Sequence, residues 1–275
     1  MPTMDSQRLD EAVSGMTASA RIERILILGG TVEARRLAAA LANRPGLGVT
    51  LSLAGRTAEP IAHSVPVRRG GFGGAEGLAD YLRSQRIDLL IDATHPYAAA
   101  ISANATRAAE LAGVTLLAIR RSPWRRLDGD NWIEVADAAE AARALGDAPR
   151  RVFLALGRNE LAPFATCPQH FYLVRSVDPV DPPLPVPHAR YITARGPFSE
   201  AADRALLEEH RIEIVVAKNS GGDAAYGKIA AARALALPVV MIERPPLPGV
   251  PSVASVEAAL AWLDHAGTEA AARGV

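Results

Sequence analysis

Short apolar runs alternate with alanine-rich amphipathic stretches along the chain. In the first half, the apolar runs predict five strands, at Arg24–Leu28, Val49–Ala54, Val65–Val67, Asp88–Ala93 and Val114–Ile119. The stretches between them predict helices that end near Ala42, Arg86 and Ala112. Strands that alternate with helices in this way indicate βα units built on a parallel sheet.

The same pattern resumes after an irregular segment, Arg120–Asn131, which is rich in arginine and contains proline and tryptophan. Further strands are predicted at Val152–Leu156, Phe171–Val177, Tyr191–Thr193, Ile212–Ala217 and Val239–Ile242, and a closing helix at Val256–Asp264. We therefore predict an α/β fold of two Rossmann-like lobes, with mainly parallel sheets and a cleft between them. The lobes are expected at residues 24–122 and 123–275, after a disordered tail at residues 1–23.

Composition and charge narrow the class of protein. The 275 residues carry no net charge, which argues against a general nucleic-acid binder. No apolar run is long enough to cross a membrane, and no secretory signal is evident, so we expect a cytoplasmic protein. The single cysteine, Cys167, and the scattered histidines predict no metal site. No apolar seam is evident, so a monomer is expected.

The loop after the first predicted strand has the chemistry of a phosphate site. Gly29 and Gly30 would let the main chain approach a pyrophosphate, and Thr31 could donate its hydroxyl hydrogen. Glu33 follows in the first turn of the predicted helix. A tight turn without a ligand stays an alternative, because this is not a complete G-x-G-x-x-G motif.

The loop after the second predicted strand favours NADPH over NADH. It reads Ala54-Gly55-Arg56-Thr57 and has no acidic residue until Glu59. A carboxylate at this place holds the ribose hydroxyls of NAD, whereas the Arg56 guanidinium could grip a 2′-phosphate. An arginine that is merely solvated at the surface is the alternative.

Two further loops carry titratable groups. Thr94, His95, Pro96 and Tyr97 follow a buried strand, and the histidine and tyrosine could contact a nicotinamide or donate a proton. A helix cap with a half-buried aromatic is the alternative. Later in the chain, Lys218-Asn219-Ser220-Gly221-Gly222 directly follows an apolar strand, as an anion-binding loop would.

A competing motif overlaps that last loop. Gly222–Ile229 matches the phosphate-binding pattern G-x-x-x-x-G-K-[ST] except at its final position. Ile229 lacks the hydroxyl that would ligate Mg²⁺, and Asp223 would place negative charge against the phosphates. A phosphotransferase that uses Lys228 is therefore the weakest of the functions considered.

Taken together, these loops resemble the signature segments of the precorrin-6A reductase family, in that family's order. The segments are Ile27–Ala34, Ala54–Thr57, Arg69–Gly73, Asp92–Ala98 and Ala217–Gly222. The similarity spans roughly Ile25 to Pro245, and the fourth and fifth segments are the specific ones. The resemblance implies a cytoplasmic reductase of cobalamin biosynthesis that transfers hydride from NADPH to one double bond of precorrin-6A, giving precorrin-6B.

The resemblance also implies roles for the loop residues, with the nucleotide on the first lobe and the tetrapyrrole substrate in the cleft. The cofactor-binding residues would be Gly29, Gly30, Thr31, Glu33, Ala54, Gly55, Arg56, Thr57, Gly73, Thr94, His95, Pro96 and Tyr97. The substrate-binding residues would be Arg158, Arg195, Lys218, Asn219, Ser220, Gly221 and Gly222. His95, Tyr97 and Lys218 are unranked candidates for the proton donor. An NADPH-binding sensor without catalysis is the main alternative function.

Overall fold

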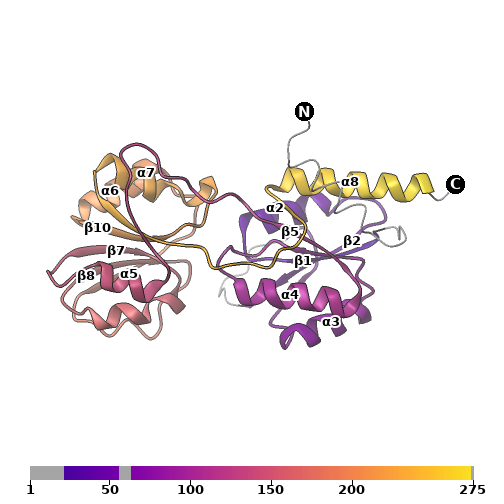
Figure 1. Cartoon of the computed structure of the whole chain (residues 1–275), viewed down its shortest axis with the longest axis horizontal. Coiled ribbons are helices and arrows are strands. Elements are labelled where there is room, and N and C mark those ends of the chain that lie inside the picture. Colours follow the sequence, from indigo (N-terminus) through magenta and orange to yellow (C-terminus); the bar gives the residue numbers. More distant parts are fainter. Residues whose placement is uncertain (1–21, 56–62, 274–275) are drawn as a thin grey trace. The chain divides into compact units, whose positions relative to one another are not determined.

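The computed structural model describes residues 22–55 and 63–273 (Figure 1). The tail expected at residues 1–23 therefore lies, up to residue 21, outside the described residues, as do Arg56 and Thr57. The chain forms two compact units. Unit 1 contains the residues up to Arg121 and those from Pro246 onward, and unit 2 contains Ser122–Pro245.

Unit 1 is a six-stranded parallel sheet with helices on both faces. Its strands lie in the order β12-β5-β4-β1-β2-β3. Their bounds are β1 Arg24–Leu28, β2 Gly48–Leu53, β3 Val67–Arg69, β4 Leu89–Asp92, β5 Thr115–Ile119 and β12 Ser252–Val253. The helices are α2 Val32–Leu41, α3 Gly74–Ser84, α4 Ala99–Ala112 and α8 Val256–Arg273.

Alternation along β1 explains the two layers of helices in unit 1. Ile25 and Ile27 are fully buried in one core, which the apolar faces of α2 and α8 cover. Leu26 and Leu28 point to the opposite face and pack against α3 and α4. The two pairs of helices lie on opposite sides of the sheet in Figure 1. Both faces are thus apolar, as parallel sheets require.

Unit 2 repeats this architecture. Its strand order is β6-β11-β10-β7-β8-β9, and every pair is parallel. The strands are β6 Asn131–Val135, β7 Arg151–Ala155, β8 Phe171–Ser176, β9 Ala189–Thr193, β10 Ile214–Lys218 and β11 Pro238–Ile242. The helices are α5 Ala138–Ala144, α6 Glu200–Glu209 and α7 Gly227–Ala234, with single turns η1 Arg158–Glu160, η2 Ala162–Thr166 and η3 Asp223–Ala225. The predicted α/β class with parallel sheets is confirmed.

The prediction that the second domain runs to residue 275 is wrong for its last thirty residues. β12 pairs in parallel with β5, and Arg120 donates its main-chain N–H to the carbonyl of Val253. Trp262 and Leu263 of α8 are buried in the same core as α2. Residues 246–273 therefore complete unit 1, because both an edge strand and a covering helix come from this end of the chain.

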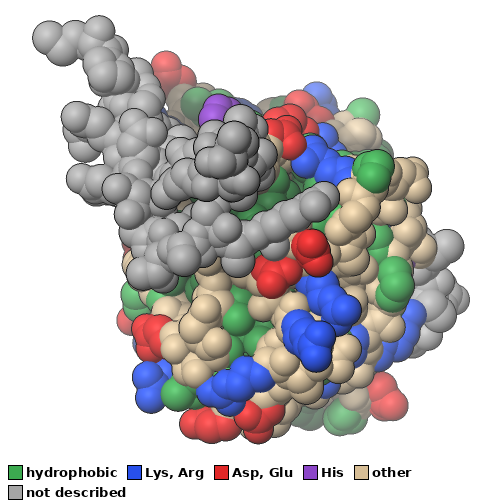
Figure 2. Space-filling view, turned by 90° about the vertical axis from the view of Figure 1, so that its right-hand side faces the viewer, with side chains coloured by type: hydrophobic (Ala, Val, Ile, Leu, Met, Phe, Trp, Pro, Cys, Tyr) green, Lys and Arg blue, Asp and Glu red, His purple; other side chains and the backbone are tan. Residues whose placement is uncertain are grey.

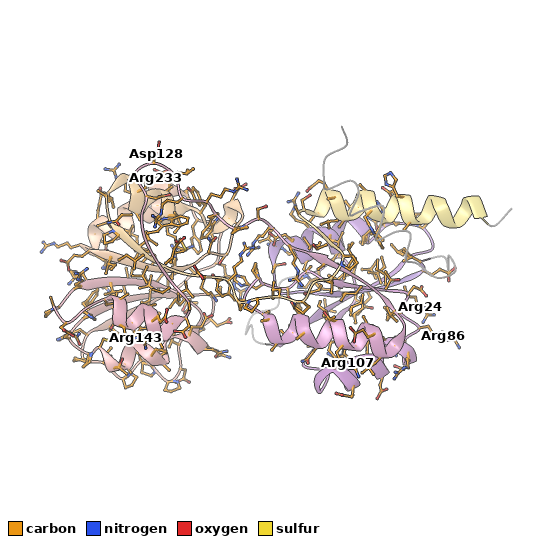
Figure 3. The ribbon with its side chains drawn as sticks, in the orientation of Figure 1. Arg24, Arg86, Arg107, Asp128, Arg143 and Arg233 are labelled. Atoms are coloured by element: carbon orange, nitrogen blue, oxygen red, sulfur yellow. The ribbon has the colours of Figure 1, made fainter. Side chains whose placement is uncertain are left out.

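Several arginines lie where their guanidinium groups stay in contact with water. Arg86, Arg107 and Arg143 are exposed and lie at the periphery of their units, where a guanidinium stays solvated (Figure 3). In the face shown in Figure 2, basic and acidic side chains lie among one another, with apolar side chains scattered between them. This distribution fits the absence of net charge in the whole sequence.

Candidate functional site

The loop between β1 and α2 leads directly into the N-terminus of α2. Thr31 is the N-cap residue, and its hydroxyl oxygen accepts from the main-chain N–H of Ala34 at 3.1 Å. The same hydroxyl donates to the carbonyl of Ala93 at 2.7 Å. Thr31 thus ties the first loop to the loop after β4, so its hydroxyl hydrogen is already used within the protein.

Gly30 is the open position of this loop. Its φ is +112°, a conformation that only glycine adopts without strain, and a Cβ built there would meet no atom of the described residues within 4 Å. Gly29 is different, since a Cβ there would lie 2.6 Å from the Leu51 side chain. The first glycine therefore serves packing, and the second leaves room for a ligand beside the main chain.

Sheet topology places this loop at the ligand-binding point of the fold. The chain connects β1 to β2 on one side of β1, whereas β4 and β5 lie on the other side. In open parallel sheets, ligands bind at the carboxyl ends of the strands where the connections diverge in this way. A small pocket lies there, lined by Thr31, Glu33, Ala93, Thr94, Pro96, Ile119 and Arg121.

The loop after β4 is held by a buried carboxylate that the sequence prediction did not include among the site residues. Asp92 is 3% exposed, and its Oδ1 accepts from both the main-chain N–H and the hydroxyl of Thr94, at 3.1 and 2.6 Å. Its Oδ2 accepts from the Ser102 hydroxyl at 2.6 Å, and Arg120 lies 3.7 Å away. An acidic residue that ends an all-apolar strand was the available signal.

His95 and Tyr97 lie together on this loop. Their ring centroids are 5.6 Å apart, and His95 Nδ1 accepts from the main-chain N–H of Tyr97 at 3.3 Å. An acceptor Nδ1 means that Nε2 carries the proton in the neutral ring. Pro96 lies in a turn, and α4 begins only at Ala99.

Glu33 and Arg121 form an ion pair beside the loop between β1 and α2, in which one guanidinium nitrogen binds both carboxylate oxygens. Arg121 NH1 lies 2.8 Å from Oε1 and 2.9 Å from Oε2 of Glu33. Burial raises the pKa of Glu33, but hydrogen bonds from Arg121 and the main chain, together with the charge of Arg121, outweigh it. The net result is a pKa below the ordinary value of 4.5.

From this ion pair we predict a contribution to the free energy of unfolding that is lost in acid. Because the pKa of Glu33 is lower in the folded protein, its stabilising effect is present above the unfolded pKa and is lost as pH falls through the folded pKa. We expect Glu33→Gln to lose less stability than the unchanged protein between about pH 5 and pH 3. Urea unfolding at several pH values measures this. An identical acid-dependent loss in both proteins would contradict the assignment.

Two further glycine-containing loops follow β2 and β3, on the side of β1 away from β4. Ala54 and Gly55 are exposed at the end of β2, and Gly55 has a φ of +76°. Gly73, with a φ of +82°, is the N-cap of α3 and offers no side-chain cap. Arg68 braces the turn by donating to the carbonyls of Gly70 and Gly71 and by stacking on Phe72 at 3.6 Å.

Positive charge gathers near the same end of the sheet. Burial and the nearby guanidinium groups of Arg35 and Arg69 lower the pKa of His63 from its ordinary value of 6.5. Arg35 lies in the second half of the first turn of α2, and Arg69 ends β3. Arg35 and Arg69 therefore bring two guanidinium groups close to His63 in this part of unit 1.

In unit 2, the predicted residues also lie at carboxyl ends of strands. Lys218 ends β10, and its Nζ lies 2.7 and 2.8 Å from the two carboxylate oxygens of Glu160, a partner that sequence reasoning missed. Arg158 and Arg195 are exposed, and Arg195 lies 3.8 Å from Asp178. Ser220 is only 9% exposed, so most of its surface is covered by the protein itself and little is left for a substrate.

Lys228 does not present its ammonium as a phosphate-binding loop would. It is 5% exposed, donates to the carbonyl of Ala225 at 2.6 Å and lies 4.8 Å from the centre of the Trp124 ring. The residues before it form the short turn η3 rather than an open loop. This geometry argues against the phosphotransferase alternative.

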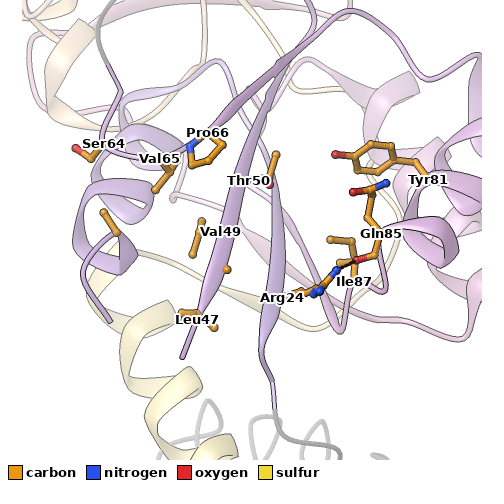
Figure 4. Close-up of a pocket in the computed structure, with 12 residues that line it drawn as sticks. Arg24, Leu47, Val49, Thr50, Ser64, Val65, Pro66, Tyr81, Gln85 and Ile87 are labelled. Carbon is orange, nitrogen blue, oxygen red and sulfur yellow. Dashed lines mark hydrogen bonds between the residues drawn. The ribbon is translucent and has the colours of Figure 1, made fainter. Parts of the chain in front are cut away.

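A separate pocket of about 440 Å³ lies at the amino-terminal ends of β1 and β2 (Figure 4). Tyr81 and Gln85 line one side and Val65 and Pro66 the other. The pairing of β3 with β2 begins at Val67, opposite Leu51. Val49, which borders the pocket, pairs with Ile25 of β1 and with no residue of β3. The pocket is at the opposite end of the sheet from the glycine loops.

Comparison with known proteins gives a consistent picture. A family described as precorrin-6x reductase CbiJ/CobK matches residues 24–264. A precorrin-6A reductase from Sinorhizobium sp is 53% identical over 249 residues, covering 90% of this chain and 95% of the relative. A solved structure of CobK precorrin-6A reductase has a TM-score of 0.84 and 49% identity, covering 89% of this chain and 97% of that one.

A more distant relative carries cobalt in the name of its substrate. A cobalt-precorrin-6A reductase from Priestia megaterium is 29% identical, covering 80% of this chain and 90% of the relative.

Within the described part of the chain, no helix is both long and apolar enough to span a membrane. No group of three or more histidine, cysteine or acidic side chains in that part is arranged to hold a metal ion.

Proposed function

Because the chain belongs to the precorrin-6x reductase CbiJ/CobK family, we propose that it reduces precorrin-6A to precorrin-6B with NADPH. Membership in this family makes the chain an oxidoreductase of cobalamin biosynthesis that acts on a CH–CH group. The nicotinamide cofactor, the residues that hold it and the metal-free state of the substrate are parts of the proposal.

The open main chain at Gly30 is the observation that carries the cofactor assignment. It lies at the N-terminus of α2 and at the topological switch point of unit 1. The first N–H groups of a helix have no partner within the helix and favour an anion. A pyrophosphate there would meet the main chain of Gly30 and the start of α2, with Thr94 and Pro96 on the other side of the pocket.

The adenosine end of the cofactor would then extend toward Ala54, Gly55 and Gly73. The guanidinium groups of Arg35 and Arg69 near His63 make this region positive, which supports a 2′-phosphate and hence NADPH rather than NADH. Arg56 and Thr57 follow Gly55 directly in the sequence. Our assignment of Arg56 to the 2′-phosphate rests on that position.

NADPH, when bound, supplies the hydride for the double bond, and the protein supplies placement and a proton. Reduction of a conjugated double bond by hydride leaves a neighbouring carbon that must gain a proton. His95 could donate this proton from Nε2, since its Nδ1 already accepts from Tyr97. The Tyr97 hydroxyl and the Lys218 ammonium are the other candidates.

The substrate would meet unit 2 through its carboxylates. Arg158, Arg195 and Lys218 all lie at carboxyl ends of strands, and Glu160 fixes the position of the Lys218 ammonium. A flat macrocycle with carboxylates on its rim needs such cations around an apolar body. The metal-free form is favoured, because the relative named for it is 53% identical and the one named for the cobalt form 29% identical.

Two measurements test the proposed function. Titration of the purified protein with NADPH and NADH, followed by cofactor fluorescence, should show tight binding of NADPH and weak binding of NADH. Incubation with precorrin-6A and NADPH should then consume one NADPH for each macrocycle reduced. Binding of NADPH without any turnover of precorrin-6A would instead support the sensor alternative, and no binding at all would refute the proposal.

Arg56→Glu tests the 2′-phosphate assignment. Loss of a guanidinium–phosphate contact should reduce the preference for NADPH over NADH by at least about tenfold. The ratio of the two dissociation constants measures this. Arg107→Glu makes the same charge change at an exposed position of α4 and should leave the ratio unchanged. If the ratio is unaltered in Arg56→Glu, Arg56 does not bind the 2′-phosphate, and other cations of this region would have to do so.

The small number of exposed large apolar side chains supports a monomer. Among the described residues, these side chains are Val32, Ile101, Leu127, Ile133 and Val177. Dimer interfaces concentrate such side chains in one patch.

A further inference from the structure

The chain passes between its two units twice, and both crossover segments meet the same loop of unit 2. The first crossover segment, residues 122–130, leads from β5 to the edge strand β6. The second, residues 243–251, leads from β11 to the edge strand β12. Both reach the carboxyl end of β10, where the loop Lys218–Gly222 begins.

Asn219 binds the main chain of the first crossover segment. Its Oδ1 accepts from the N–H of Trp124 at 2.7 Å, and its Nδ2 donates to the carbonyl of Trp124 at 3.1 Å. The side chain thus satisfies both main-chain groups of one residue, much as a neighbouring strand would. The indole of Trp124 also donates to the carbonyl of Gly222 at 2.8 Å.

Gly221 allows the first crossover segment to come this close. A Cβ at this position would lie 2.1 Å from the carbonyl oxygen of Ser122, and the residue has a φ of +67°. Both the space and the backbone conformation therefore require glycine. This gives a structural reason for a glycine that sequence reasoning assigned to the substrate.

Arg244 holds the same loop from the second crossover segment. Its Nε donates to the carbonyl of Asn219 at 2.8 Å, and its NH2 donates to the carbonyl of Ser220 at 3.0 Å. The main-chain N–H of Asn219 in turn donates to the carbonyl of Ile242 at the end of β11. Two consecutive carbonyls of the loop are therefore fixed by one guanidinium.

We propose that Asn219 and Arg244 are positioning residues, which fasten both crossover segments to the loop that presents Lys218. Asn219 then acts on the substrate through the loop and not by direct contact. The link between loop order and substrate binding rests on the proposed function of Lys218. The fastening itself does not, because it consists of contacts within unit 2.

Hydrogen exchange of the Trp124 amide in the full-length protein, without ligands, tests the fastening. Asn219→Ala removes the acceptor and should speed this exchange by at least about tenfold, the effect of one or two lost hydrogen bonds. Tryptic cleavage after Arg125 and Arg126 should speed up as well. Asn219→Asp keeps the acceptor for the Trp124 N–H and should give a smaller increase, so it also serves if the alanine variant does not fold.

Steady-state kinetics with precorrin-6A tests the link to the substrate. Asn219→Ala and Arg244→Gln should raise KM for precorrin-6A by at least about tenfold, while the dissociation constant of NADPH stays within about twofold. Asn219→Asp should recover part of the loss. Lys218→Ala should raise the same KM without faster exchange at Trp124. Asn104→Ala, at an exposed position of α4, should change neither quantity.

Three results would each overturn a defined part of this picture. Unchanged exchange and cleavage in both Asn219 variants would refute the fastening, whatever the enzyme does. Faster exchange with an unchanged KM would refute the positioning role. The third result is faster exchange and a higher KM in the Asn219 variants, together with an unchanged KM in Lys218→Ala. It would keep Asn219 as a positioning residue but refute the substrate role proposed for Lys218.

Discussion

Asp203→Ala is expected to lower the free energy of unfolding by about 3–5 kcal/mol, the cost of leaving a buried charge without its partner. Asp203 is 1% exposed in the first turn of α6, and Arg175 at the end of β8 is 8% exposed. Arg175 NH1 binds Oδ1 of Asp203, and NH2 lies 3.4 Å from Oδ2. Chemical denaturation, followed by circular dichroism and by tryptophan fluorescence, measures the loss.

The surroundings of Arg175 make escape to solvent costly. Its guanidinium lies 3.8 Å from the centre of the Phe198 ring and 4.9 Å from that of Phe153. Phe198 belongs to the loop that carries Arg195, and its main-chain N–H donates to the carbonyl of Ala224 at 3.0 Å. An unpaired guanidinium would therefore disturb a loop with a proposed role in substrate binding.

Replacement of both partners separates the charge from the packing. A well-packed apolar pair is often as stable as a buried ion pair. We therefore expect Arg175→Met combined with Asp203→Leu to be more stable than Asp203→Ala alone. Asp203→Asn keeps the shape but not the charge and should fall between the unchanged protein and Asp203→Ala. A loss below about 1 kcal/mol in Asp203→Ala would mean that Arg175 reaches water.

Strands with both faces buried were predictable from the sequence, and weak edge elements were not. The predicted β1 has the observed bounds, Arg24–Leu28, because each of its apolar residues packs on one of two helical layers. The edge strand β6 has only Trp132 buried, so its sequence does not stand out from the irregular segment before it. β12 has two residues and exists only through its pairing with β5.

The candidate loops could be found in the sequence because parallel strands place their carboxyl ends at one edge of a sheet. The partners of the loop residues could not. Asn219 meets Trp124 across 95 positions, and Lys218 meets Glu160 across 58. A pattern of residue types identifies a polar loop, but it does not reveal whether an amide will bind a ligand or the protein's own main chain. This is why Asn219 was assigned to the substrate.

Gly30→Val is expected to weaken NADPH binding by at least about 100-fold, or about 2.7 kcal/mol. A Cβ here would meet no described protein atom within 4 Å, so a valine side chain would extend into the space assigned to the pyrophosphate. The φ of +112° adds strain that would pull the main-chain N–H groups away from the phosphate. Fluorescence titration with NADPH measures the change.

Gly113→Val is the matched control for this variant. Gly113 also has a positive φ, +66°, and a Cβ there would likewise meet nothing within 4 Å, but it caps the carboxyl end of α4. The same substitution therefore adds comparable backbone strain at the end of unit 1 away from the glycine loops. If both variants lose stability but only Gly30→Val loses NADPH affinity, the space beside Gly30 belongs to the cofactor. If their affinities change equally, the loss at Gly30 comes from strain, and the pyrophosphate must lie elsewhere.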